Sequence, residues 1–165
     1  MKYKFAFKKF TGEKIEDVVE YAKDWINSHE NIEILIGTDS QSRGERTYFS
    51  TVIAFYNKGS DGHGHGGHCI YRRWFTKRYN VDQKIERLFK EVVESVELAL
   101  YFKENGINVD FIDLDVNPKA GEKQRNKSNA IYLSSTGYVT GYGFKCRYKT
   151  LGPLVTTMAD YIVKH

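Results

Sequence analysis

The chain has 165 residues, of which 41% are hydrophobic and 15% aromatic, so it can bury the core of one domain and is not a disordered segment. No apolar run is long enough for a membrane-spanning helix, and the N-terminal MKYKFAFKKF lacks the continuous apolar stretch of a signal peptide. The formal net charge of +4 is compatible with a phosphate-bearing partner without requiring one.

In chain order, hydrophobic spacing first predicts an amphipathic helix over 14–28. Three runs rich in Thr, Val, Ile and aromatic residues then predict strands over 32–38, 47–56 and 69–77, with a Gly- and His-rich turn over 57–68. The remaining predicted elements are a long helix over 81–103, a strand over 109–116, a short helix from Ser128, a strand over 144–149, and a helix from Pro153 to about Val163. We expect a single domain over 1–165, with residues 1–30 as an N-terminal helical extension.

The order of these elements predicts the sheet topology. Short connections join the first three strands into an antiparallel meander, whereas intervening helices make the last two strands parallel crossovers. We therefore expect an α/β fold with a five-stranded mixed sheet flanked by helices. The strand over 32–38 should be central, with the strand over 109–116 as its parallel neighbour. Functional sites in such sheets gather at the carboxyl ends of parallel strands.

The two cysteines, Cys69 and Cys146, form no CxxC motif. This pattern is typical of a reducing compartment, so we expect a cytoplasmic protein without a disulfide framework.

Carboxylates follow both of the expected parallel neighbours. The segment IEILIGTDSQ ends its apolar run on Asp39, and VDFIDLDVN carries Asp113 and Asp115 on one face of its strand. If the two strands are adjacent, Asp39 and Asp115 converge, and close carboxylates repel unless a cation lies between them. Such oxygen ligands favour Mg²⁺ or Mn²⁺. Asp39 could equally form an Asx turn, and Asp115 could be a turn residue.

The long helix offers a third acid. Its expected core face consists of Ile85, Phe89, Val92, Val96 and Ala99. At about 100° per residue, Glu91 lies on the flank of that face, while Glu94 points nearly opposite to it. We therefore favour Glu91 over Glu94 as the acid that leans toward the strand ends, and expect Glu94 to face solvent. Taken alone, Glu91 could be an ordinary solvated helix residue.

The order of an acid on strand one, an acid on the crossover helix and an acid on strand four resembles the ribonuclease H-like superfamily. More closely, the fragments IGTDSQ, ERLFKEVVESVELA, LDV, RNKS and TGYVTGYGFK resemble the YkuK-type ribonuclease H-like family, whose members are mostly predicted nucleases. The resemblance covers residue 32 to the C-terminus. It implies two-metal hydrolysis of a phosphodiester with Mg²⁺ or Mn²⁺, and it maps the family's helix acid and strand-four acid onto Glu91 and Asp115.

The fourth ligand departs from the family pattern. Family members often carry an acid before the last helix, where this chain has Leu151, so Asp160 is the remaining candidate. Asp160 points away from the core face of its helix, however, and could be a surface acid. Asp113, where many members carry His, is a further candidate ligand.

Several polar residues could contact nucleic acid, whether RNA, DNA or a hybrid. Ser40 and Gln41 could bind sugar or phosphate, or could cap a turn with Thr38. The basic residues that follow Asp115 could meet backbone phosphates, although each could also belong to a solvated loop; they are Lys119, Lys123, Arg125 and Lys127. Arg72, Arg73 and Trp74 are compatible with stacking on a single strand.

The histidines of DGHGHGGH, namely His63, His65 and His68, suggest a zinc site. Their glycine-rich setting offers no preformed geometry, so we expect a hairpin tip that is dispensable for activity.

Two rivals to a nuclease remain. The first is a nucleic-acid-binding module with a degenerate site, suggested by the missing acid at Leu151. The second is an ATPase of the sugar-kinase or actin type, which needs two duplicated domains where 165 residues hold one.

Overall fold

The computed structural model describes residues 6–61, 64–116, 125–148 and 154–164 as a mixed sheet covered by helices on both faces. The sheet has seven strands in the order β2-β1-β5-β4-β3-β6-β7. In chain order, the described elements are β1 (Phe7–Lys9), β2 (Lys14–Ile15), α1 (Val18–Ser28), β3 (Ile32–Arg43), β4 (Arg46–Lys58), β5 (Gly64–Lys77), the 3₁₀ turn η1 (Val81–Gln83), α2 (Lys84–Glu104), β6 (Phe111–Leu114), α3 (Arg125–Gly141), β7 (Cys146–Tyr148) and α4 (Leu154–Lys164).

The predicted α/β class and the central topology are confirmed. β3 lies between its antiparallel partner β4 and its parallel neighbour β6, and β7 continues the sheet in parallel beyond β6. Five strands were expected, and that number is wrong because β1 and β2 add to the outer edge of β5. Strands of three and two residues with several lysines lack the long alternating apolar run that makes a strand recognisable.

The expected N-terminal helix starts later than predicted. Ile15 belongs to β2, and Asp17 caps α1 by accepting hydrogen bonds from the backbone N–H groups of Val19 and Glu20. The segment before the core sheet is therefore a short strand pair followed by a helix.

The β3–β4 hairpin is longer than the apolar runs suggested. Its two strands remain paired to Arg43 and Arg46, and Gly44 in the connecting turn has a φ of +53°, a conformation that favours glycine. The Gly- and His-rich run is also not wholly a turn, because β4 ends at Lys58 and β5 begins at Gly64. Polar residues on both faces concealed these extensions.

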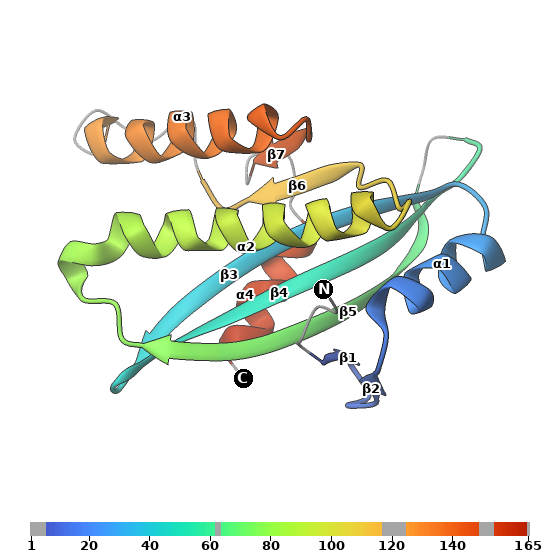
Figure 1. The fold of residues 1–165 in the computed structure, drawn as a ribbon, viewed down its shortest axis with the longest axis horizontal. Coiled ribbons are helices and arrows are strands. Elements are labelled where there is room, and N and C mark those ends of the chain that lie inside the picture. Colours follow the sequence, from blue (N-terminus) through green and yellow to red (C-terminus); the bar gives the residue numbers. More distant parts are fainter. Residues whose placement is uncertain (1–5, 62–63, 117–124, 149–153, 165) are drawn as a thin grey trace.

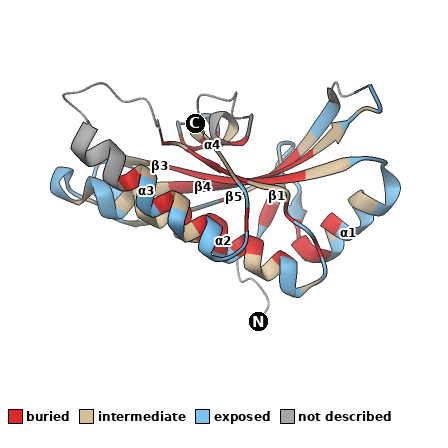
Figure 2. Cartoon of the chain, turned by 90° about the horizontal axis from the view of Figure 1, so that it is seen from above, coloured by how far each residue is buried: buried red, intermediate tan, exposed pale blue. Residues whose placement is uncertain are grey.

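Two hydrophobic layers hold the sheet between the helices (Figure 2). One layer packs α1, α2 and α3 against Ile34, Ile36 and Ile53. The other packs Val155, Ala159 and Ile162 of α4 against Leu35 and Val52. Because side chains alternate along a strand, the even-numbered residues of β3 face α2 and the odd-numbered ones face α4.

Across 6–61, 64–116, 125–148 and 154–164, no helix is long and apolar enough to span a membrane.

Candidate active site

Asp39 lies where β3 and β6 part. The two strands pair only at Leu35–Phe111, Ile36–Ile112 and Gly37–Asp113, although β3 itself continues to Arg43 beside β4. We expected Asp39 at the end of its strand, but β3 continues past it. Asp39 lies two residues beyond the last pair of β3 with β6. The same register continued by two residues brings Asp39 level with Asp115.

The Asp39 carboxyl is buried and interacts with two other acids. The pKa of Asp39 is raised to about 6, chiefly by burial and in part by the charges of Asp115 and Asp160, against the opposing effect of a hydrogen bond from the Ser40 N–H to Oδ1 (2.8 Å). The structure thus brings Asp39 into electrostatic contact with one strand acid and one helix acid.

Close packing of α4 on β3 explains the approach of Asp160. A Cβ atom on Gly37 would lie 3.0 Å from Val155 Cγ1, so the glycine lets the start of α4 approach the sheet closely. Asp160 forms an ion pair with Lys164 (2.6 Å), and 44% of its side chain is exposed. It is a partly exposed residue, as the helical spacing indicated, yet it lies close enough to influence Asp39.

Glu91 reaches the same junction from the opposite face. Its carboxylate is buried, accepts a 2.5 Å hydrogen bond from the Ser40 hydroxyl and lies 3.8 Å from Arg87 Nη1. Burial raises the pKa of Glu91 well above its usual value, and the negative charges of Asp39 and Asp115 add to this, while Ser40 and Arg87 oppose it. The Glu91 carboxyl therefore interacts electrostatically with both Asp39 and Asp115.

Ser40, a candidate for contact with sugar or phosphate, makes its hydrogen bonds within the protein. Besides donating to Glu91, it accepts hydrogen bonds from Arg87 Nη1 at its carbonyl oxygen (2.6 Å) and at its hydroxyl (2.7 Å). Sequence reasoning missed Arg87, although its position four residues before Glu91 on a helix is a recognisable pairing signal.

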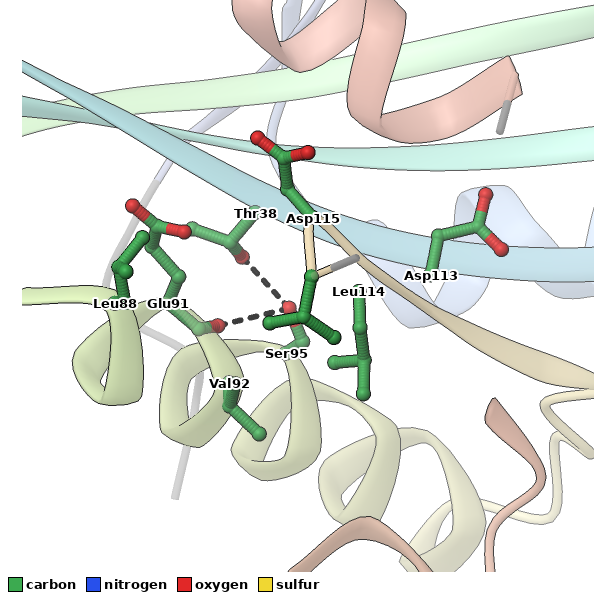
Figure 3. Close-up of a pocket in the computed structure, with 9 residues that line it drawn as sticks. Thr38, Leu88, Glu91, Val92, Ser95, Asp113, Leu114 and Asp115 are labelled. Carbon is green, nitrogen blue, oxygen red and sulfur yellow. Dashed lines mark hydrogen bonds between the residues drawn. The ribbon is translucent and has the colours of Figure 1, made fainter. Parts of the chain in front are cut away.

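A cavity of only about 10 Å³ lies beneath the junction, between β6 and α2. Thr38, Glu91, Ser95 and Asp115 are among its lining residues (Figure 3). Ser95 Oγ lies 2.8 Å from Thr38 Oγ1 and 3.0 Å from the Glu91 carbonyl oxygen, which fixes this turn of α2 against β3. A space that holds about one water molecule cannot admit a nucleotide, so a substrate would have to approach the acids from outside.

Asp113 is engaged by an arginine. Its Oδ1 and Oδ2 accept hydrogen bonds from Arg147 Nε (2.9 Å) and Nη2 (3.0 Å) of β7, and its carboxylate is turned away from those of Glu91 and Asp115 (Figure 3). This bidentate pair compensates the buried charge of Asp113. The arrangement does not support Asp113 as a metal ligand.

The expectation that Glu94 faces solvent is wrong. Glu94 is 8% exposed and forms ion pairs with Arg72 of β5 (2.6 Å) and Lys90 (2.7 Å). The helical spacing was judged from apolar residues alone, so a buried ion pair on the flank of the core face went unseen. Ile85, placed in that core face, is 44% exposed.

The structure describes only some of the other residues that could contact nucleic acid. Gln41 is half-buried and accepts a hydrogen bond from Arg43 (2.9 Å). Arg125 and Lys127 lie in the first turn of α3, but their side chains are outside the described residues. Lys119, Lys123 and Leu151 also fall outside the described ranges.

His68 is a strand residue and not part of a hairpin tip. It stacks on Trp25 of α1 (centroids 4.1 Å apart), and its Nε2 lies 2.7 Å from the Tyr21 hydroxyl. His63, as well as the side chain of His65, is outside the described residues. Arg72 and Trp74 face the α2 layer: Arg72 is buried over the Trp74 ring, which itself stacks on Phe49.

The donor set at the junction suits a hard divalent cation in its chemistry. Asp39, Glu91, Asp115 and Asp160 offer only carboxylate oxygens, and the mutual repulsion of these acids, part of the cause of the raised pKa values of Asp39 and Glu91, would be relieved by a cation. In the described part of the chain, however, no three His, Cys, Asp or Glu side chains are already gathered to hold a metal ion. The chemistry fits a metal, and binding would require the carboxylates to draw closer.

Comparison with known proteins gives a match to one family. The model of the family described as Ribonuclease H-like matches residues 13–164. No curated protein matches the chain. Among solved structures, RNase H1 from the halophilic archaeon Halobacterium salinarum NRC-1 is similar at 14% identity, covering 80% of this chain and 98% of that chain with a TM-score of 0.37.

Proposed function

The chain belongs to the ribonuclease H-like family, and from this premise we propose that it is a divalent-metal-dependent nuclease that hydrolyses phosphodiester bonds in nucleic acid. The observation that best supports the proposal is the coupling of Asp39 to Asp115, Asp160 and Glu91 at the β3–β6 junction. These acids come from β3, from the residue after β6 and from helices on both faces of the sheet, and their interaction supports a shared cation site at this junction.

We assign metal binding to Asp39, Glu91 and Asp115, with Asp160 as a fourth ligand. A bound Mg²⁺ or Mn²⁺ would supply an activated water and stabilise the leaving oxygen. Asp39 interacts with each of the other three acids, so we assign it the central role in holding the metal. Ser40 and Arg87 position the Glu91 carboxylate, and Ser95 and Thr38 fix the helix turn that carries it. Asp113 is left out because Arg147 occupies both of its oxygens.

The test is cleavage of labelled single-stranded RNA, single-stranded DNA, RNA–DNA hybrid and branched duplex, with Mg²⁺, with Mn²⁺ and with EDTA. The proposal expects cleavage of at least one substrate, with either metal and not with EDTA. Asp115→Asn should abolish it, whereas Glu97→Gln, on an exposed face of α2, should not. Absence of cleavage of all four substrates with both metals would contradict the proposal.

A second candidate is a nucleic-acid-binding module without catalysis. The observation that favours it is the engagement of Glu91 by Ser40 and Arg87, together with the lack of a gathered acid set in the described residues. This candidate expects the same substrates to bind without being cut.

A further inference from the structure

Three cross-strand rows extend along the α4-facing side of β3, β4 and β5, starting from Asp39. The pairing register aligns Asp39 with Ser50 and Arg73, then Gln41 with Tyr48 and Phe75, and finally Arg43 with Arg46 and Lys77. Paired residues point to the same side of a sheet, so these side chains share one face. Successive rows on one face are about 7 Å apart along the strands. We call Gln41, Arg46, Tyr48, Arg73, Phe75 and Lys77 the β3–β5 platform.

The platform exposes an aromatic ring close to the end of β5. Phe75 is 53% exposed, whereas Phe49, on the opposite face of the neighbouring strand, is fully buried. The left-hand ends of β3, β4 and β5 extend past α4, which covers the same face nearer the middle of the sheet (Figure 1). Together with the half-buried Tyr48, whose ring lies 5.9 Å away, Phe75 offers an aromatic surface to a partner.

Arginines frame the aromatic rings. The Arg46 guanidinium lies over the Phe75 ring (4.2 Å to the centroid), and that of Arg73 lies over Tyr48 (5.1 Å). The two rings are themselves 5.9 Å apart. None of Arg46, Arg73 and Lys77 forms an ion pair within the described residues, and Glu45, in the adjacent hairpin turn, is the only acidic residue of the stretches 41–49 and 72–80.

We propose that the β3–β5 platform binds a single-stranded segment of nucleic acid and leads it toward Asp39. Bases would stack on Phe75 and Tyr48, while Arg46, Arg73 and Lys77 would meet the backbone phosphates. Unpaired bases are required because a duplex hides its base faces, and alternating cationic and aromatic groups match the chemistry of a single strand better than that of an acidic peptide. The direction toward Asp39 rests on the proposed function, but binding to the platform does not.

Binding can be measured separately from cleavage by fluorescence anisotropy of labelled oligonucleotides in EDTA. Phe75→Leu should weaken binding of a single strand at least about fivefold and leave binding of a duplex of the same sequence unchanged. The matched control is Phe10→Leu, which changes an aromatic ring of similar exposure outside the platform and should have no effect. Circular dichroism should confirm that both variants are folded.

The charged part of the platform has its own readout. Arg46→Gln should lower the slope of log affinity against log salt by about 0.7 for a single strand, and Lys14→Gln, an exposed lysine of β2, should leave the slope unchanged. The proposal is overturned if Phe75→Leu and Arg46→Gln both bind the single strand as wild type does. It is also overturned if poly-glutamate binds as tightly as the oligonucleotide and Phe75→Leu changes the affinity for neither ligand.

The two proposals fail in different ways. If single-strand binding depends on Phe75 but no cleavage occurs with either metal, the platform proposal is supported and the nuclease proposal is contradicted. If cleavage is metal-dependent but its KM is unchanged by Phe75→Leu and Arg46→Gln, the nuclease proposal is supported and the platform proposal is contradicted.

Discussion

The Ser40 hydroxyl donates a 2.5 Å hydrogen bond to Glu91 Oε1, and this contact joins β3 to α2. Ser40 faces α2, while its neighbour Asp39 faces α4, so the two acids reach the junction from opposite faces. Ser40 contacts both acids, because its backbone N–H also donates a hydrogen bond to Asp39 Oδ1 (2.8 Å).

Ser40→Ala should lower the free energy of unfolding by about 1–2 kcal/mol, because a buried carboxyl loses a hydrogen-bond donor. It should also raise the pKa of Glu91 further, since the Ser40 hydroxyl is one of the groups that lower it. Urea denaturation measures the first effect, with Ser60→Ala, in an exposed turn, as the control. Equal losses in the two variants would show that the Ser40–Glu91 bond adds no stability.

Glu94→Ala should be strongly destabilising, by about 3–5 kcal/mol, because it leaves the buried Arg72 guanidinium without its carboxylate. Glu97→Ala, three residues later on the exposed face of α2, should change stability by less than about 0.5 kcal/mol. Chemical denaturation of the two variants compares them directly. A loss of stability in Glu94→Ala as small as that in Glu97→Ala would contradict the buried ion pair and would agree with the solvent-facing position first expected for Glu94.

These acids show how far sequence could predict the site. Asp39, Asp115 and Glu91 could be proposed as ligands because strand alternation and helical spacing fix the directions of side chains next to apolar runs. The partners Arg147 and Arg72 were not identifiable, since each pairing joins elements far apart in sequence. Arg87 was missed although it lies four residues before Glu91 on the same helix. The central strand order followed from connection lengths, whereas β1 and β2 are too short and too polar to carry a strand pattern.

Asp39→Asn should stabilise the metal-free protein above pH 6. With a folded pKa of about 6 against an ordinary 3.8, Asp39 contributes stability that is present below pH 4 and lost as pH rises through 6. The loss amounts to about 3 kcal/mol at most. Unfolding in EDTA between pH 4 and 8 should therefore show a flatter profile for Asp39→Asn than for wild type. Parallel stability profiles for the two proteins would mean that the pKa of Asp39 is not raised in the folded state.

Mn²⁺ should reverse that loss in the wild-type protein. Added at pH 7.5, it should raise the thermal midpoint of wild type and have a much smaller effect on Asp39→Asn, because the variant lacks one ligand and part of the repulsion that a cation relieves. Differential scanning fluorimetry with a Mn²⁺ titration measures both, and an equal rise in both proteins would place the metal elsewhere.

His68→Ala should lower the thermal midpoint without reducing nuclease activity. The ring packs on Trp25 and Tyr21, a contact worth about 0.5–1.5 kcal/mol, and it lies in β5 outside the acid cluster. Burial lowers the pKa of His68, so this contribution is present at neutral pH and weakens as pH falls through 6.5. His68→Phe, which keeps an aromatic ring, is the matched control. Loss of cleavage in a folded His68→Ala protein would contradict this prediction.

The most direct test of the central claim is the single-turnover rate of phosphodiester cleavage by wild type and Asp39→Asn, at saturating Mg²⁺ or Mn²⁺ and saturating oligonucleotide. Asp39 is the proposed metal ligand that interacts with all three of the other acids. Its replacement should therefore reduce the cleavage rate at least about 100-fold while oligonucleotide binding in EDTA is retained. Equal rates in the two proteins would contradict the account.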